Sequence, residues 1–318
     1  MKNKSYVLTL LPIFLISCST NTKTVESKIF CFDTYVDVKL FEGQNDDVKE
    51  IESIFKIYDK LSDNYQSRDV NNVYTINQTN DSVTVDEQLF KMLQASFEVH
   101  NKGAAYFNPL CGTLAKKWKE ALDNKQVLDN ETITTELNKI NTTTVSFAEN
   151  NLITRTGEAE LDLGGIAKGY ALDVVKSYLD EKEIKQYLIN AGSSSILLGE
   201  KNTKDGLFTV GLKDVNNAYL KMKNCFVSTS SISEQNAVIN GVTYSHIINP
   251  VTGSAVSEND AVIVISDTGY IGDALSTSMM MNTVEEIKSI ETEQNIKAIV
   301  IKNGNITYKN DSIEVYYH

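Results

Sequence analysis

The segment that most constrains the fold lies at residues 160–170 and reads Glu-Leu-Asp-Leu-Gly-Gly-Ile-Ala-Lys-Gly-Tyr. Its two adjacent glycines, Gly164 and Gly165, permit a tight turn, and an amphipathic helix pattern follows directly. Glycines let the backbone approach a phosphate closely, and the free N–H groups of a helix start can bind it. Lys168 lies one turn into the helix, where its ammonium can reach a phosphate oxygen. The segment indicates an anion site, although by itself it fits an ordinary strand-to-helix turn equally well. The predicted buried face of the helix carries Ile166, Tyr170, Val174 and Tyr178.

The rest of the chain mixes helical and strand patterns. Strands that follow helices without strict alternation indicate the α+β class. The stretch 124–144 is polar and carries no clear pattern. Asn303-Gly304 predicts a hairpin turn. Helical spacing predicts helices over 46–61, after Asp86, over 114–122 and over 284–290, and apolar runs predict strands over 29–40, 187–189, 208–212, 261–265, 296–301 and 306–308.

Composition excludes some classes of partner. The 318 residues, 42% of them hydrophobic, suffice for one large domain or two small ones. The net charge is −12 and the sequence pI is about 4.8. Such a surface repels nucleic acid, which is therefore not expected as a partner. A polyanionic substrate would need a metal ion or oriented backbone amides to offset this charge locally.

The N-terminus has the pattern of a lipoprotein signal. A basic start at Lys2 and Lys4 precedes an apolar run that is too short to span a membrane as a helix. Leu15-Ile16-Ser17-Cys18 then matches a lipobox, in which Cys18 is lipidated and becomes the mature N-terminus. The alternative is an ordinary secretory signal that happens to contain a cysteine. We expect a signal peptide over 1–17, a tether over 18–28 and a domain over 29–318, anchored by lipid to the extracytoplasmic face of the cell membrane.

Three further cysteines, Cys31, Cys111 and Cys225, lack the paired spacing of a zinc site. We expect buried free thiols, and one disulfide is the alternative outside the cytoplasm.

A candidate metal pair lies at Asp273 and Thr277. On a helix, residues four apart share a face. A carboxylate and a hydroxyl on that face are hard oxygen ligands, which suit Mg²⁺ better than zinc. The alternative is that Asp273 only caps the helix and Thr277 only fills space.

His246 stands in a loop pattern, because the Pro250 and Gly253 that follow it mark a chain leaving a strand. A lone histidine is more often structural than catalytic, but a loop placement favours access to a cleft. Aromatic and amide residues at 106–112 could bind a flat ring. Small hydroxyl residues end two expected strands, at 190–195 and 228–231.

The order and content of these clusters resemble the ApbE family of FAD:protein FMN transferases. The most specific match is the run from Asp162 to Tyr170, followed by 245–253 with its His-Ile-x-x-Pro-x-Thr-Gly pattern. The resemblance covers nearly all of the chain after residue 28. Asn108 and Asn249 stand where the family more often has aspartate, and Ser193 and Ser231 where it has glycine. Further matching segments are Phe32-Asp33-Thr34, 59–77, Phe107-Asn108-Pro109, Asn190-Ala191-Gly192, Ser228-Thr229-Ser230 and 273–277.

This resemblance implies a single ApbE-like, T-fold-like domain of mixed sheet and helices, with FAD in a cleft and Mg²⁺ on the FAD diphosphate. By matching positions, the metal would be held by the Gly165 carbonyl, Asp273 and Thr277, with Ser276 as an extra ligand. His246 is expected to do acid–base work, and Lys168 to offset charge on the diphosphate. The FAD contacts would be Phe32, Tyr106, Phe107, Asn108, Asp162, Lys168 and Ile248.

The implied reaction moves FMN from FAD to a threonine or serine hydroxyl of an exported redox protein and releases AMP. FAD and that flavin-accepting protein are the expected partners. Two alternatives remain at this point: a Mg²⁺-dependent hydrolase that releases free FMN and AMP, and a non-catalytic flavin-binding lipoprotein. The Asp273–Thr277 pair argues against the second, since a pure binder needs no metal on the diphosphate.

Overall fold

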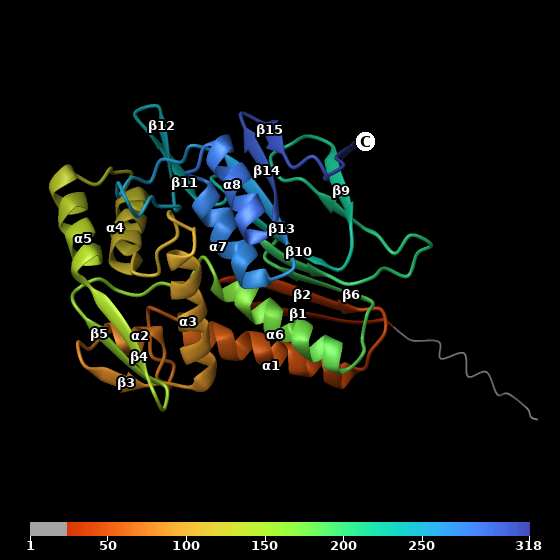
Figure 1. The fold of residues 1–318 in the computed structure, drawn as a ribbon, viewed down its shortest axis with the longest axis horizontal. Helices are drawn as coiled ribbons and strands as arrows, with labels where there is room; N and C mark the ends of the chain where they lie inside the picture. Colours follow the sequence, from red (N-terminus) through yellow and green to blue (C-terminus); the bar gives the residue numbers. More distant parts are fainter. Residues whose placement is uncertain (1–23) are drawn as a thin grey trace, which may run out of the picture.

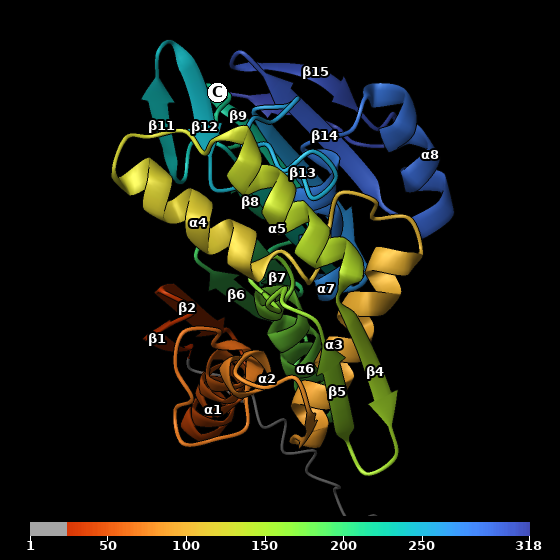
Figure 2. The ribbon, with the colours of Figure 1, turned by 90° about the vertical axis from the view of Figure 1, so that its left-hand side faces the viewer.

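The computed structural model describes residues 24–318 (Figures 1 and 2). The predicted signal peptide, Cys18 and the first residues of the tether lie outside these described residues. Within the described part of the chain, no helix combines the length and the apolar character needed to cross a membrane.

An eight-stranded sheet forms the centre of the molecule, and each neighbouring pair of its strands is antiparallel. Strands distant in sequence are neighbours in it, so the loops at their ends meet. In spatial order its strands are β1 (Val25–Cys31), β2 (Thr34–Leu40), β6 (Tyr187–Ala191), β7 (Ser195–Leu198), β10 (Cys225–Ser231), β13 (Ala261–Ser266), β14 (Lys297–Lys302) and β15 (Asn305–Lys309).

Helices cover one face of this sheet, which we call the helical face (Figure 1). They are α1 (Asn45–Ser62), α6 (Ala167–Glu181), α7 (Gly269–Met279) and α8 (Val284–Gln294). A small sheet of β8 (Phe208–Gly211), β9 (Ala218–Met222) and β16 (Tyr316–Tyr317) covers part of the opposite face, which we call the outer face. Because both faces are covered at β13, all six of its residues are buried. Val262 and Val264 join the core under the helices, and Ile263 and Ile265 join the core under the small sheet.

The remaining elements pack beside this layered body (Figure 2). They include a three-stranded sheet of β3, β5 and β4 and a hairpin of β11 and β12. Their bounds are α2 (Val73–Asn77), β3 (Ser82–Thr84), α3 (Glu87–Asn101), α4 (Gly112–Asp123), α5 (Asn130–Thr142), β4 (Thr144–Ala148), β5 (Leu152–Thr156), β11 (Asn236–Ile239) and β12 (Val242–Ser245).

Most of the predicted elements are confirmed. The helices expected over 46–61, 114–122 and 284–290 are α1, α4 and α8. Asp86 caps α3 by accepting the N–H of Gln88 at 2.8 Å, as its sequence position predicted. The strands expected over 187–189, 208–212, 261–265, 296–301 and 306–308 correspond to β6, β8, β13, β14 and β15.

One predicted strand needs correction, and two further stretches contain elements that no pattern indicated. The single strand expected over 29–40 is a hairpin, because Phe32 and Asp33 turn the chain with φ angles of 53° and 54°. Its first strand begins at Val25, inside the expected tether. The featureless stretch 124–144 contains α5, which Asp129 caps by accepting the N–H of Thr132 at 2.7 Å.

The buried face of α6 also differs from the predicted one. Its fully buried residues include Ala171, Leu172, Val175 and Leu179, which face the core. The predicted tyrosines are half-buried and face α1: the Tyr170 ring lies 5.5 Å from that of Tyr58. The side of α6 that the apolar spacing predicted to face the core is therefore covered by a second helix, α1.

Candidate functional site

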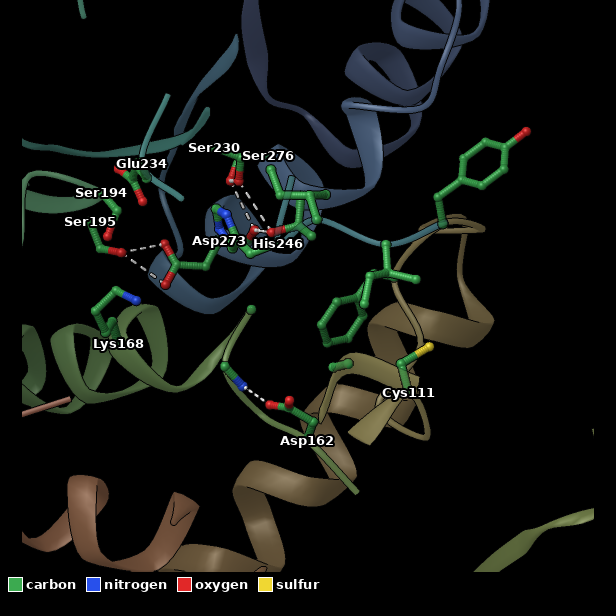
Figure 3. A pocket seen from close by; sticks show the side chains of 18 of the residues that line it. Cys111, Asp162, Lys168, Ser194, Ser195, Ser230, Glu234, His246, Asp273 and Ser276 are labelled. Carbon is green, nitrogen blue, oxygen red and sulfur yellow. Dashed lines mark hydrogen bonds between the residues drawn. The ribbon is translucent and has the colours of Figure 1, made fainter. Parts of the chain in front are cut away.

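One cavity of about 230 Å³ collects almost all the predicted site residues (Figure 3). It lies on the helical face, where β7 and β10 meet α6 and α7. Phe32 does not line it, since its ring packs edge-on against Phe55 at 6.4 Å in the β1–β2 turn. The predicted residues that do line it are Tyr106, Phe107, Asn108, Asp162, Gly165, Lys168, His246, Ile248, Asp273, Ser276 and Thr277.

The glycine segment forms one wall of the cavity. Asp162 Oδ1 accepts the N–H of Gly164 at 2.7 Å, which closes the turn before α6. The backbone of Gly165 then passes close to its neighbours: a Cβ there would lie 3.3 Å from the Phe107 ring and 3.5 Å from Thr277 Oγ1. The diglycine turn therefore brings Asp162 and the Thr277 hydroxyl to the same cavity, far apart as they are in sequence.

Asp273 lies at the bottom of the cavity and is 6% exposed. Ser195 donates to Oδ1 and Oδ2 at 2.8 and 3.0 Å, Ser228 donates to Oδ1 at 2.7 Å, and the N–H of Gly169 donates to Oδ2 at 2.6 Å. Burial raises the pKa of Asp273, whereas the nearby Lys168 ammonium and these hydrogen bonds lower it. The site thus holds a desolvated carboxylate whose donors favour its ionised form.

The hydroxyls of Ser276 and Thr277 lie one turn further along α7. Both donate to the Asp273 backbone carbonyl, at 2.9 and 3.2 Å, and both lie within hydrogen-bond distance of Ser230 Oγ, at 3.0 and 3.2 Å. Each hydroxyl oxygen keeps a lone pair for a further partner.

These residues fit a hard divalent cation. In the described part of the chain, no three His, Cys, Asp or Glu side chains gather into a metal site, so Asp273 would be the only charged ligand. No lysine or arginine of residues 24–318 forms a direct ion pair with it; Lys168 acts from a greater distance, and a bound cation would further offset the cost of burying this charge. Hydroxyl and carbonyl oxygens complete the kind of ligand set that Mg²⁺ accepts together with substrate phosphates.

His246 follows β12, and its imidazole faces the open cavity. Its Nδ1 lies 3.2 Å from the carbonyl oxygen of Gln235. A carbonyl can only accept, so this contact places the proton on Nδ1 and leaves the Nε2 lone pair free. Desolvation by the surrounding protein lowers the pKa of His246, and the positive charges of Lys168 and Lys213 lower it further. The hydrogen bond to Gln235 and the negative charge of Glu234 act in the opposite direction but do not cancel this shift. A neutral imidazole with a free Nε2 is suited to accept a proton.

The aromatic wall is built from the loop between α3 and α4. The Tyr106 N–H donates to Ser278 Oγ at 3.1 Å, which ties this loop to α7. The Phe107 carbonyl lies 2.6 Å from Nδ1 of His100. Phe107 is buried and Tyr106 is half-buried, so the wall offers apolar ring surface beside the polar floor.

Some residues of the site were not assigned by the sequence. Ser195 and Ser228 belong to the hydroxyl clusters noted at strand ends, but only the sheet order shows that both reach Asp273. Glu234 lines the cavity and gave no signal of its own. Asp173, on α6, accepts the N–H groups of Gly269 and Tyr270 at 2.8 Å and so caps α7 from outside that helix.

The three described cysteines are free, as expected. Cys111 lines the cavity, and burial raises its pKa to about 12, with Asp162 adding to the shift. Its thiol is therefore protonated at neutral pH and is a poor nucleophile.

Comparison with known proteins gives concordant results. A model of the ApbE family matches residues 32–300. The FAD:protein FMN transferase of Klebsiella pneumoniae (strain 342) is 30% identical over 235 residues, which cover 70% of this chain and 72% of that protein. The protein of the same name from Treponema pallidum (strain Nichols) is 27% identical over 217 residues, covering 62% of this chain and 60% of that protein. The crystal structure of the ApbE protein of Thermotoga maritima shares the fold, with a TM-score of 0.79 at 24% identity over 91% of this chain and 98% of that one.

Proposed function

The chain belongs to the ApbE family, and we propose that it is an FAD:protein FMN transferase. It takes the FMN half of FAD, joins it to a serine or threonine hydroxyl of an exported protein, and releases AMP. The observation that carries the proposal is the convergence of Asp273, Thr277, Lys168 and His246 on one cavity with an aromatic wall.

The Mg²⁺ requirement is part of the proposal. The ion would be held by the Gly165 carbonyl, the Asp273 carboxylate and the Thr277 hydroxyl, with Ser276 as a further ligand. When bound, it would neutralise charge on the FAD diphosphate. The support for this is the buried carboxylate, which has no direct ion-pair partner among residues 24–318, and the set of oxygen donors around it.

The chain's own residues divide the remaining work. Lys168 lies where its ammonium lowers the pKa of Asp273, and it is placed to contact the diphosphate oxygens as AMP departs. Tyr106, Phe107 and Ile248 would hold the flavin portion by apolar contact. Since the cavity is smaller than a drug-sized pocket, it suits the diphosphate and its neighbours, and the ends of FAD would extend beyond it.

The chemical step is a phosphoryl-type transfer. The acceptor oxygen attacks the FMN phosphorus, the bond from that phosphorus to the bridging oxygen breaks, and AMP leaves with that oxygen. His246 Nε2 accepts the proton of the attacking hydroxyl. The product is a flavin held by a phosphoester bond.

The cellular setting follows from the N-terminal pattern and is likewise proposed. A lipid on Cys18 would hold the domain at the extracytoplasmic face of the cell membrane. An exported redox protein in that compartment would gain a flavin that cannot diffuse away.

The test combines the purified protein with FAD, Mg²⁺ and candidate exported acceptors, and weighs each acceptor by mass spectrometry. A mass gain equal to FMN less one water, with an equal amount of AMP released, is expected. Release of FMN and AMP without any acceptor gain would instead identify a hydrolase. Binding of FAD with no AMP release in any mixture would identify a flavin carrier.

A further inference from the structure

A second cavity lies on the outer face of the sheet, between β6–β7 and the small sheet. Its volume is about 650 Å³, well above that of the first cavity. We call it the outer groove. Its floor and wall include Leu188, Ile196, Val227 and Ile263 from the large sheet and Thr209 and Gly211 from β8.

The groove combines aliphatic side chains with small polar ones. Its lining, drawn from residues 24–318, includes Asn190, Ser193, Thr209 and Thr229, contains no aromatic residue, and has Lys213 as its only charged side chain. A flat flavin or adenine ring is usually held by aromatic stacking, and the aromatic residues of the described site line the other cavity. The groove is therefore better suited to aliphatic side chains than to the rings of FAD.

The groove borders the candidate active site at the end of β7. Thr229 lines both cavities, and its N–H donates to the carbonyl of Ser194 at 2.7 Å at the end of β7. Lys213 of the groove also pairs with Glu234 of the active-site cavity at 3.2 Å. A chain lying in the groove would thus reach the reacting phosphorus around the end of β7.

One side of the groove is an unpaired sheet edge. β8 pairs only with β9, so its second edge has no strand neighbour among residues 24–318. That edge carries Thr209, Val210 and Gly211, all of which line the groove. Free backbone N–H and C=O groups beside an aliphatic floor form the usual arrangement for adding an extended peptide to a sheet.

We propose that the outer groove binds the acceptor polypeptide as an extended segment along the β8 edge, so that its hydroxyl enters the active-site cavity past Thr229. This inference rests on the proposed transferase function. Backbone pairing with β8 would supply affinity that does not depend on sequence, and alternate side chains would contact Leu188, Ile196 and Val227. The acceptor is thus recognised as an unfolded or looped segment rather than as a rigid surface.

The main variant adds bulk at the β8 edge that lines the groove. Among residues 24–318, a Cβ on Gly211 meets no atom within 4 Å, so Gly211→Tyr is tolerated at its Cβ and obstructs an extended chain that pairs with this edge. Ile196→Phe adds bulk from the floor as a second, independent variant. Thr307→Tyr, on the exposed part of β15 at the far edge of the sheet, is the matched control.

The probe is a pool of synthetic peptides, each with one central threonine and no other hydroxyl residue, incubated with FAD and Mg²⁺. Covalent flavin on the peptides is read by fluorescence and mass. FAD affinity and flavin transfer to whole exported acceptor proteins are measured in parallel, because FAD affinity reports on the active-site cavity and transfer to a whole acceptor reports on the proposed function.

With the parent protein and with Thr307→Tyr, a subset of peptides should gain flavin. Gly211→Tyr and Ile196→Phe should lower kcat/KM for those peptides by about tenfold or more, with FAD affinity unchanged. The proposal is overturned if both variants transfer flavin to peptides normally, if they weaken FAD binding, or if the parent labels whole exported acceptors but no peptide. A parent that labels neither peptides nor whole acceptors would count against the transferase function itself.

Discussion

The backbone N–H of Gly169 donates to Asp273 Oδ2 at 2.6 Å, so the first turn of α6 directly contacts the middle of α7. The two helices come this close because glycines meet at the crossing. A Cβ on Gly169 would lie 2.3 Å from the carbonyl oxygen of Gly269 and 2.9 Å from Asp273 Cγ. The position of the buried carboxylate therefore depends on a residue that carries no functional group.

Gly169→Ala should push α6 and α7 apart and displace Asp273. Overpacking of this kind destabilises a fold by about 1–3 kcal/mol. Urea unfolding measures the loss, and AMP release from FAD should fall with it. Gly211→Ala is the control, since its Cβ has open space and should change the free energy of unfolding by about 0.5 kcal/mol at most. If both substitutions lowered the free energy of unfolding and AMP release equally, the close crossing of α6 and α7 would not explain the loss.

Asp273→Asn should abolish Mg²⁺-dependent FAD cleavage, because it removes the charge and keeps the shape. Asp273→Ala should also be inactive, and it leaves Ser195, Ser228 and the Gly169 N–H without their acceptor, at about 1–3 kcal/mol for each buried group left unpaired. Thr277→Val should be milder, since it removes a neutral ligand. The measurement is AMP release over a range of Mg²⁺ concentrations. Full activity of Asp273→Asn at limiting Mg²⁺ would rule out the metal site.

His246→Ala should lower flavin transfer by roughly 10²–10⁴-fold, the usual range for loss of a general base. FAD affinity should change little, because the aromatic wall and Asp273 are untouched. In the parent, the rate should fall as pH drops, with a midpoint below the ordinary histidine value of 6.5, because only the neutral ring accepts a proton. A variant that loses FAD affinity and transfer by the same factor would make His246 a binding residue.

Asp173→Asn should change how stability depends on pH. Burial raises the pKa of Asp173 to about 6 from an ordinary 3.8, so between these values the folded state holds more protons than the unfolded state. The contribution of Asp173 to the free energy of unfolding therefore falls as pH rises through this window, by about 2 kcal/mol once partial solvent screening is allowed for. The variant cannot ionise, so its stability relative to the parent should improve by about that amount between pH 4 and pH 7. Urea unfolding of parent and variant at the two pH values checks this. A difference between their free energies of unfolding that is the same at both pH values would contradict the prediction.

Cys18→Ala tests the anchor, which lies outside the described residues. The lipobox reading predicts that the variant is left unprocessed by the lipoprotein pathway or is shed into the medium. Cell fractionation and the mass of the N-terminal peptide decide this. A variant that stays on the membrane at the normal mature mass would defeat the prediction.

The elements that depend on near neighbours could be predicted from the order of residues alone. α1 and α8 form where apolar residues recur every three or four positions, and Asp86 caps α3 through the N–H of Gln88, two residues later. The two adjacent glycines and the helical pattern after them also explain why 160–170 forms a turn and then a helix. α5 gave little signal because only Glu136 and Ile140 of its residues are buried, and its contact with α4 includes an ion pair from Glu136 to Lys117 at 3.2 Å. The resemblance of ordered motifs identified the family, and the family model and the Klebsiella relative confirm it.

How these elements meet follows from contacts between residues far apart in the chain. Ser195 and Asp273 are 78 residues apart, and the order of strands in the sheet and the packing of α7 upon it bring that hydroxyl to that carboxylate. Asp173 caps a helix that begins 96 residues later, and Phe32 turns away from the cavity because its hairpin packs against α1. Such contacts depend on long chain closures whose entropic cost is offset by burial of the whole core, so no local pattern of residues encodes them.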